Sequence, residues 1–183
     1  MIDPDSNGIE GDGDPFAALG MARSLDLTSA EVAAAHLRAC ARVHPDRARD
    51  PVERDRLLRD SALLGSAKRV LQDPVLRAEA LLRIAGVPTG EVPLAPAFLM
   101  ETLDLREAIE SAVQGGDAAL LASLRAQADA LQRAAMDDLR AALGGPAGAA
   151  GEAAASDAGQ RARSALARLR YAARMVARLS EAL

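Results

Sequence analysis

A histidine, a proline and an aspartate stand together at positions 44 to 46 and would present an imidazole and a carboxylate at one corner of the chain. Proline fixes its φ at about −65° and disfavours helix at the preceding residue, so a helix that reaches His44 must end there. An acid and base pair is one chemistry open to His44 and Asp46, but neither a nucleophile nor a glycine-rich phosphate loop accompanies them. We therefore interpret His44, Pro45 and Asp46 as a rigid docking turn without catalytic activity.

A second set of chemically capable residues, His36, Cys40 and His44, recurs at every fourth position. Neighbouring members could share a metal ion, but the outer two would lie about 12 Å apart along a helix, so the three cannot bind one zinc ion. A small metal-dependent hydrolase using His36 and His44 would need more ligands than the sequence supplies. We predict no bound metal and no cofactor, with His36 partly packed in a core and Cys40 an inert small residue.

The helix that leads into the turn is marked by a capping box formed by Thr28 and Glu31. Its predicted core stripe, at helical spacing, consists of Val32, His36, Ala39 and Val43. Arg38 and Arg42 lie one turn apart off that stripe, and the helix and turn together carry four arginines against two acids. This basic surface favours an acidic partner, with an ordinary solvated helix face as the alternative.

The chain after the turn predicts a second helix over residues 52–72, antiparallel to the first. Leucines at seven-residue spacing mark its core stripe, which neighbouring apolar residues widen: Leu57, Leu64 and Leu71, with Leu58, Leu63, Ala67 and Val70. Asp14 and Pro15 predict the start of a short helix over residues 16–19 that packs on this hairpin. Pro74 opens a further helix over residues 75–85.

Composition and charge limit the classes of protein to consider. Half of the 183 residues are apolar, but many are alanine, so the helices must pack closely through small side chains. A net charge of −4 argues against binding to nucleic acid, which usually needs a strongly basic face. The sequence shows neither a signal-peptide pattern nor an apolar run of about 18 residues, and its single cysteine excludes an internal disulfide. We expect a soluble, cytoplasmic protein that does not enter a membrane.

The helical patterns, and the proline- and glycine-rich stretches that separate them, predict an all-α fold in two domains. We expect a disordered tail over residues 1–13, a helical module over residues 14–85, a proline-rich linker over residues 86–96 and an antiparallel three-helix bundle over residues 97–183. The bundle helices are predicted over residues 97–113, 117–143 and 161–183. A glycine- and alanine-rich flexible loop is expected at residues 144–160.

The first predicted helix of the bundle carries two apolar faces. Its core stripe consists of Phe98, Thr102, Leu105, Ile109 and Ala112. Leu99, Met100 and Leu103 fall on the far side together with the acids Asp104, Glu107 and Glu110. A helix in the middle of a bundle would also be apolar all round, but three acids there would be unusual.

The last helix has its stripe at Leu166, Leu169, Ala173, Val176 and Leu179, and the second helix has Leu120, Leu124, Ala128, Leu131 and Ala135.

These residues carry a resemblance to a known family. The first module, with its His-Pro-Asp turn after a basic helix, resembles a J-domain, and residues 61–67 and 71–82 (LQDPVLRAEALL) look like the end of the J-domain in HscB/Jac-type co-chaperones of iron–sulfur cluster assembly. Residues 98–107 (FLMETLDLRE) are similar to the opening of that family's C-terminal bundle. Leu37 departs from the pattern, because many J-domains have a basic residue at its place.

The resemblance implies a protein with two binding ends and no enzymatic activity of its own. One end would contact an HscA-like heat-shock chaperone ATPase and stimulate ATP hydrolysis, through His44, Pro45 and Asp46 with Arg38, Arg42 and Arg47. The other would hold an IscU-like iron–sulfur scaffold protein, through Leu99, Met100, Leu103, Asp104 and Glu107 with Tyr171, which lies off the core stripe of the last helix. The alternative is a general J-domain protein that recruits unfolded clients to a chaperone.

Overall fold

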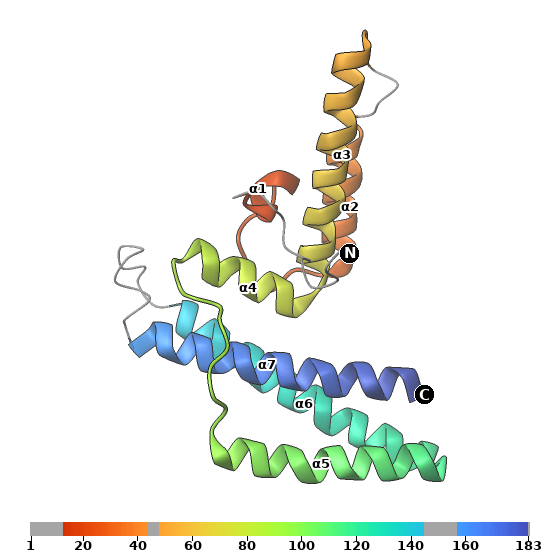
Figure 1. Cartoon of the computed structure of the whole chain (residues 1–183), viewed down its shortest axis with the longest axis vertical. Coiled ribbons are helices and arrows are strands. Elements are labelled where there is room, and N and C mark those ends of the chain that lie inside the picture. Colours follow the sequence, from red (N-terminus) through yellow and green to blue (C-terminus); the bar gives the residue numbers. More distant parts are fainter. Residues whose placement is uncertain (1–12, 44–47, 145–156, 183) are drawn as a thin grey trace, which may run out of the picture. The chain divides into compact units, whose positions relative to one another are not determined.

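The structure is a computed structural model that describes residues 13–43, 48–144 and 157–182. These residues contain only helices and turns, as the sequence predicts (Figure 1). The seven helices are α1 (Pro15–Leu19), α2 (Ser29–Cys40), α3 (Pro51–Gln72), α4 (Pro74–Ile84), α5 (Pro96–Gly115), α6 (Ala118–Leu143) and α7 (Asp157–Ala182). The predicted docking residues His44, Pro45, Asp46 and Arg47 lie outside the described residues.

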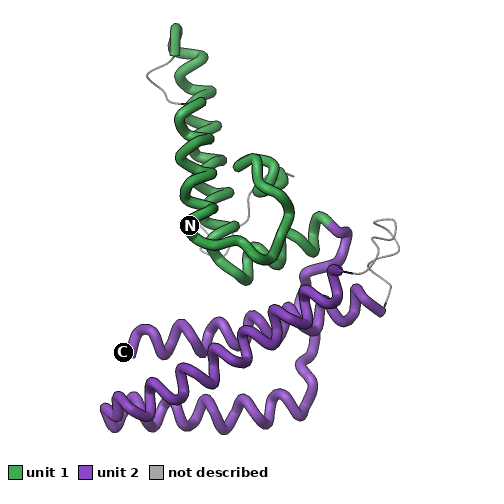
Figure 2. Tube along the Cα trace, turned by 180° about the vertical axis from the view of Figure 1, so that it is seen from behind, with its two compact units in different colours: residues 1–84 green, residues 85–183 purple. Residues whose placement is uncertain are grey.

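The helices divide into two compact units, residues 1–84 and 85–183 (Figure 2). The first unit contains α1 to α4, and the second contains α5 to α7. The division falls beside the predicted linker, at the end of α4.

Unit 1 is built on the hairpin of α2 and α3. α2 begins as the sequence predicts, because Thr28 and Glu31 form both hydrogen bonds of the capping box. α1 packs on both hairpin helices through Phe16 and Leu19, which are buried against Val32 and other apolar residues of the hairpin. The core therefore lies at the end of the hairpin that α1 covers.

The apolar stripe of α3 is narrower than we predicted. Leu64, Ala67, Val70 and Leu71 are buried, but Leu58 and Leu63 are about half exposed. The core of unit 1 receives only residues of the C-terminal half of α3, where α1, α2 and α4 surround one side of the helix, so Leu58 and Leu63 stay in contact with solvent. The prediction that Leu58 and Leu63 belong to the core was wrong.

Arg77 connects three parts of unit 1. This α4 side chain is buried, and its Nη1 donates hydrogen bonds to the carbonyl oxygens of Leu71, at 2.7 Å, and of Leu27, at 3.0 Å. Burial lowers the pKa of the guanidinium, while the charges of Asp26 and Asp73 act in the opposite direction. Arg77 thus links α4 to the end of α3 and to the segment that precedes α2.

Unit 2 is the predicted bundle of three helices, with α6 and α7 forming its most extensive pair and α5 contacting both. Gly116, at a φ of 65°, ends α5 in the left-handed conformation, and Asp117 then accepts a hydrogen bond from the N–H of Leu120 to cap α6. This tight connection makes α5 and α6 antiparallel neighbours.

Three features of the bundle differ from the sequence prediction. In α7, Ala172 and Met175 are buried, whereas Ala173 and Val176 of the predicted stripe are only half-buried. In α6, Leu121 is buried and Leu120 is 42% exposed, so the core stripe begins one residue later than predicted. α7 begins at Asp157, so the last four residues of the predicted loop 144–160 are helical. An ion pair of 2.7 Å between Arg161 and Asp157 supports this first turn, and the alanines nearby are strong helix formers despite the neighbouring glycines. None of the described helices is long and apolar enough to cross a membrane.

Candidate partner-binding surfaces

The inner face of α5 packs in the core of unit 2. Leu105, Ile109 and Ala112 are buried there against α6 and α7 residues. Thr102 is also buried, and its hydroxyl donates a hydrogen bond of 2.7 Å to the carbonyl oxygen of Phe98, so its polar group is satisfied inside the helix. The predicted core stripe of α5 is therefore confirmed for these four residues, while Phe98 is half-buried.

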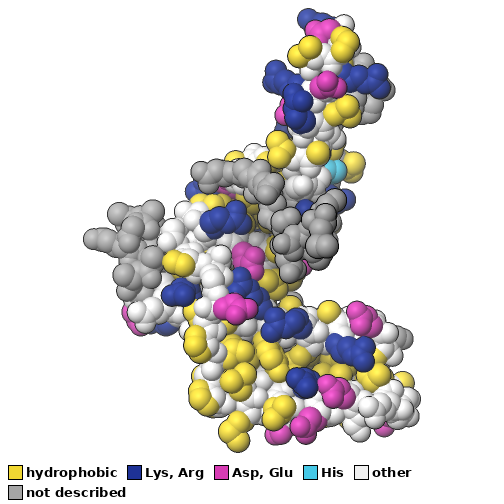
Figure 3. All heavy atoms as spheres, viewed as in Figure 1, with side chains coloured by type: hydrophobic (Ala, Val, Ile, Leu, Met, Phe, Trp, Pro, Cys, Tyr) yellow, Lys and Arg dark blue, Asp and Glu magenta, His cyan; other side chains and the backbone are white. Residues whose placement is uncertain are grey.

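The opposite side of α5 leaves its apolar side chains in solvent. Leu99, Met100 and Leu103 are 44%, 72% and 47% exposed. Asp104 and Glu107 are exposed on the same helix. We call the surface formed by these five residues the α5 outer face, and Figure 3 shows hydrophobic side chains gathered over this helix.

Core packing does not account for the α5 outer face. Its exposed apolar residues are three neighbours on one side of one helix rather than isolated side chains. Contiguous exposed apolar patches with a polar rim are typical of sites that bind another macromolecule. The exposure predicted from the helical pattern is thus present, and the binding role of the face remains a prediction.

Tyr171, which the family resemblance groups with the α5 residues, contacts α5 through its aromatic ring. Its ring meets the ring of Phe98 edge to face, with centroids 5.8 Å apart and planes at 77°. The guanidinium of Arg174 lies 5.5 Å from the centre of the Tyr171 ring. These contacts hold the half-buried Tyr171 beside Phe98, which directly precedes Leu99 of the outer face. A helical-periodicity argument cannot find an aromatic pair between two helices, because it treats each helix by itself.

The outward surface of α2 has the opposite charge. Arg38 is exposed in the last turn of α2. Arg42 is exposed in the turn that follows, because the helix ends at Cys40 and does not continue to Val43 as predicted. Leu37 is 70% exposed beside them. We call the surface formed by Leu37, Arg38 and Arg42 the α2 basic face. It directly precedes the His-Pro-Asp turn, whose residues lie outside the described part of the chain.

The possible metal ligands of α2 contact each other without a third ligand in the described residues. The Sγ atom of Cys40 lies 3.3 Å from Nε2 of His36, and both side chains are half-buried. Within residues 13–43, 48–144 and 157–182 no group of three histidines, cysteines or acids could hold a metal ion. The buried stripe of α2 consists of Val32, Ala35 and Ala39, so His36 lies at the edge of the core and not within it as the predicted stripe had it.

Comparisons with known sequences place the chain among co-chaperones. Residues 94–180 match a family model described as the HSCB C-terminal oligomerisation domain. A co-chaperone protein HscB homolog of Bordetella petrii is 35% identical over 119 residues, which cover 62% of this chain and 69% of that protein. Another, from Azoarcus sp., is 36% identical over 109 residues, covering 57% of this chain and 62% of that protein.

Solved structures show the same fold. The chaperone HscB from Vibrio cholerae superposes with a TM-score of 0.73 at 24% identity, covering 92% of this chain and 96% of that one. Human co-chaperone protein HscB superposes with a TM-score of 0.74 at 21% identity, covering 99% and 84%. The two units accordingly have the architecture of an N-terminal J-domain and a C-terminal helical bundle.

Proposed function

Since the chain belongs to the HscB family of co-chaperones, we propose that it binds an IscU-like iron–sulfur scaffold protein and delivers it to an HscA-like chaperone ATPase. The scaffold would bind the α5 outer face together with Tyr171. The ATPase would bind the α2 basic face and the turn at His44, Pro45 and Asp46, with Arg47. The chain would stimulate ATP hydrolysis by the chaperone without carrying out the reaction itself.

The observation that carries this proposal is the exposure of Leu99, Met100 and Leu103 on a helix whose other side is already packed. Binding energy at interfaces is concentrated in a few apolar anchors that become fully desolvated, and a polar rim around them excludes water and sets orientation. The α5 outer face has that composition, with Asp104 and Glu107 beside the anchors. Charge at the rim affects the association rate more than the affinity, as suits a delivery protein that must release its cargo.

The alternative, a general J-domain protein for unfolded clients, is less well supported. Surfaces that bind many partners are usually flexible and rich in methionine. The α5 outer face has a single methionine, Met100, on a regular helix held by buried neighbours on its other side. The expected cytoplasmic location stays a prediction that follows from the same family assignment.

The test is a steady-state ATPase assay of the cognate chaperone with this protein and the scaffold added separately and together. We expect stimulation by this protein, and a larger stimulation when both are present. Asp46→Asn should abolish the stimulation and leave the helical content unchanged, because it changes only one charged group at the predicted turn. Full stimulation by the variant would contradict the role of the turn, and equal stimulation with and without scaffold would contradict delivery.

A further inference from the structure

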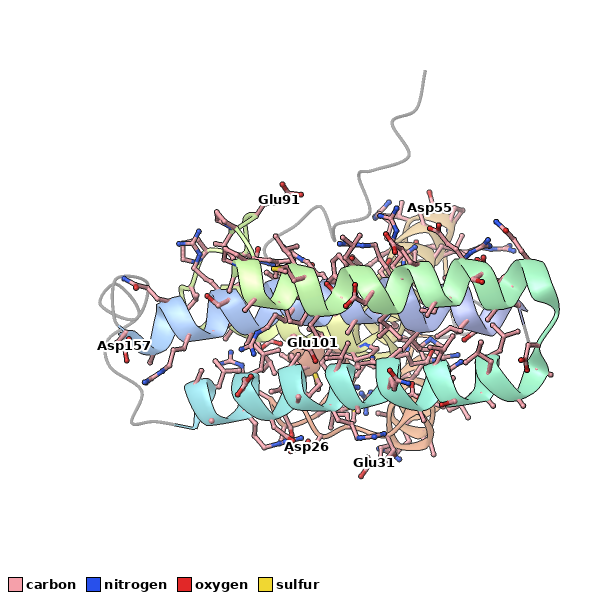
Figure 4. All side chains as sticks on the ribbon, turned by 90° about the horizontal axis from the view of Figure 1, so that it is seen from below. Asp26, Glu31, Asp55, Glu91, Glu101 and Asp157 are labelled. Atoms are coloured by element: carbon pink, nitrogen blue, oxygen red, sulfur yellow. The ribbon has the colours of Figure 1, made fainter. Side chains whose placement is uncertain are left out.

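A groove between α5 and α7 adjoins the α5 outer face. It has a volume of about 400 Å³ and an apolar floor formed by Ile109, Met175 and Tyr171. Its charged wall consists of Arg106, Arg174, Arg178 and Glu110. We call these seven residues the arginine groove. Figure 4, which looks onto α5, shows α5 and α7 running alongside each other, with Glu101 on the α6 side of α5.

The groove continues the outer face along one side of α5. Leu99, Leu103, Arg106 and Glu110 are spaced by four, three and four residues, so they form one row along the helix. The first two belong to the outer face and the last two to the groove. A partner that covers Leu103 therefore lies within one helical turn of Arg106.

The charge of the groove differs from that of the outer face and of the chain. Three arginines and one acid line it, whereas the outer face has two acids and the whole chain has a net charge of −4. Arg106 pairs with Glu110 at 3.2 Å and Arg178 with Glu181 at 3.6 Å, both within their own helices. Arg174 instead lies over the ring of Tyr171. Among the described residues, no carboxylate forms an ion pair with Arg174.

These observations define what the groove can hold. Two neighbouring guanidinium groups, Arg174 and Arg178, stand one turn apart on α7 over an apolar floor. Guanidinium groups bind carboxylates in a planar, two-pronged geometry, and an aromatic ring beneath one of them holds it in place. An acidic side chain next to an apolar one matches both parts of the groove.

We propose that the arginine groove binds an acidic segment of the scaffold protein while the α5 outer face binds the apolar contact of the same partner. This inference rests on the proposed function, because it takes the scaffold as the occupant. The partner would then be recognised by two adjoining surfaces of opposite charge. That arrangement fixes on which side of the outer face the acidic segment of the scaffold lies, since on the other side it would meet Asp104 and Glu107.

The experiment measures scaffold affinity for the full chain by titration calorimetry. Arg174→Gln combined with Arg178→Gln should weaken binding about three- to tenfold at low salt, because each exposed charge pair contributes modestly. The loss should shrink at about 0.5 M salt, where screening is nearly complete over these distances. Arg133→Gln is the matched control, since Arg133 is an exposed arginine of α6 that does not line the groove, and we expect no change.

Further variants separate the possible outcomes. If Leu103→Ala weakens scaffold binding and the double glutamine variant does not, the groove proposal is wrong and the proposed function stands. If neither change weakens binding, the proposed function itself is wrong. Replacing both arginines by lysine should restore part of the affinity, because the charge returns without the two-pronged geometry. A lysine variant as weak as the glutamine variant would contradict a role for charge.

A second copy of the chain is the remaining possible occupant of the groove. Sedimentation of the unmodified chain and of the double glutamine variant tests it. We expect both to have the same oligomeric state. An assembly that the variant loses while keeping its scaffold affinity would overturn the proposal and identify the groove as a contact between copies.

Discussion

The α2 basic face lies at the end of α2 and in the turn that follows it, the α5 outer face lies along one helix, and their compositions are opposite. The α2 basic face presents Arg38 and Arg42 with a single exposed leucine, Leu37. α5 presents three apolar side chains with acids beside them. Charged surfaces mainly accelerate and orient encounters, whereas buried apolar anchors supply most of the affinity. The comparison therefore predicts a fast, salt-sensitive contact at α2 and a contact at α5 that depends more on apolar burial.

The largest effect is expected from removing the anchors of the α5 outer face. Replacing Leu99, Met100 and Leu103 together by alanine should weaken scaffold binding about a hundredfold, because several hot-spot side chains are lost at once. The free energy of unfolding should fall by less than about 1 kcal/mol, since these positions are exposed. Calorimetric titration and chemical denaturation measure the two quantities on the same samples.

The matched control for this variant lies on the opposite side of the same helix. Ile109→Ala should reduce the free energy of unfolding by about 2–5 kcal/mol, because Ile109 is only 2% exposed in the core of unit 2. If the triple variant destabilised the protein as much as Ile109→Ala does, the outer face would be part of the core and the comparison would fail.

An intermediate effect is expected at α2. Arg38→Glu combined with Arg42→Glu should raise the concentration needed for half-maximal ATPase stimulation about tenfold at low salt, since charge reversal replaces attraction by repulsion. The difference should become small at about 0.5 M salt. Arg83→Glu, which reverses an exposed charge in the last turn of α4, should change the stimulation little. An equal loss for Arg83→Glu would show a general effect of net charge.

The exposed leucine limits how far the α2 contact can depend on charge. Leu37 is among the most exposed large apolar side chains described in unit 1. If the chaperone covers it, part of the contact will persist at high salt even in the double glutamate variant. A contact that disappears completely at high salt would show that Leu37 does not contribute.

The smallest effect concerns the start of α2. Thr28→Ala should lower the free energy of unfolding by about 1 kcal/mol, the usual cost of losing an N-cap. The pKa of Glu31 is lowered because its carboxylate accepts hydrogen bonds from the backbone N–H of Thr28, at 2.8 Å, and from the Thr28 hydroxyl, at 2.7 Å. The pKa of Glu31 is lower in the folded state than in the unfolded state, so the ionised carboxylate stabilises the folded chain. This stabilisation is complete above the ordinary carboxyl range and is lost as the pH falls through the lowered pKa.

Thermal denaturation at several pH values checks this sign. The chain should melt at a higher temperature than Glu31→Gln near neutral pH, and the gap should close as the pH falls below the ordinary range of a glutamate. A gap that widened in acid would contradict the capping role of the Glu31 carboxylate. Measuring ATPase stimulation by Thr28→Ala shows whether the α2 basic face depends on the anchoring of its helix.

The sequence predicted the elements of the fold well, because capping residues and prolines determine helix ends locally. Thr28, Pro74 and Asp117 all mark boundaries that the structure places within a residue or two of the prediction. The start of α7 was missed because a helix rich in alanine and glycine has no apolar periodicity to reveal it. The errors at Leu58 and Leu120 arose because periodicity gives a direction around a helix and leaves open how wide a strip its neighbours cover.

The candidate surfaces also include features that the sequence could predict and features that it could not. The exposure of Leu99, Met100 and Leu103 followed from the pattern of a single helix, so it could be predicted. The contact between Phe98 and Tyr171, and the groove lined by Arg106 and Arg174, depend on the relative placement of α5 and α7. No spacing within either helix contains that information.

The position of Arg77 determines how short unit 1 can be made. A fragment that ended at Gln72 would leave the Leu27 and Leu71 carbonyl oxygens without the guanidinium that both now accept from. It would also remove Ala80, which is buried in the core around Phe16. The smallest autonomous piece that keeps the hairpin and its short first helix therefore extends through α4, and its C-terminal boundary belongs at Ile84.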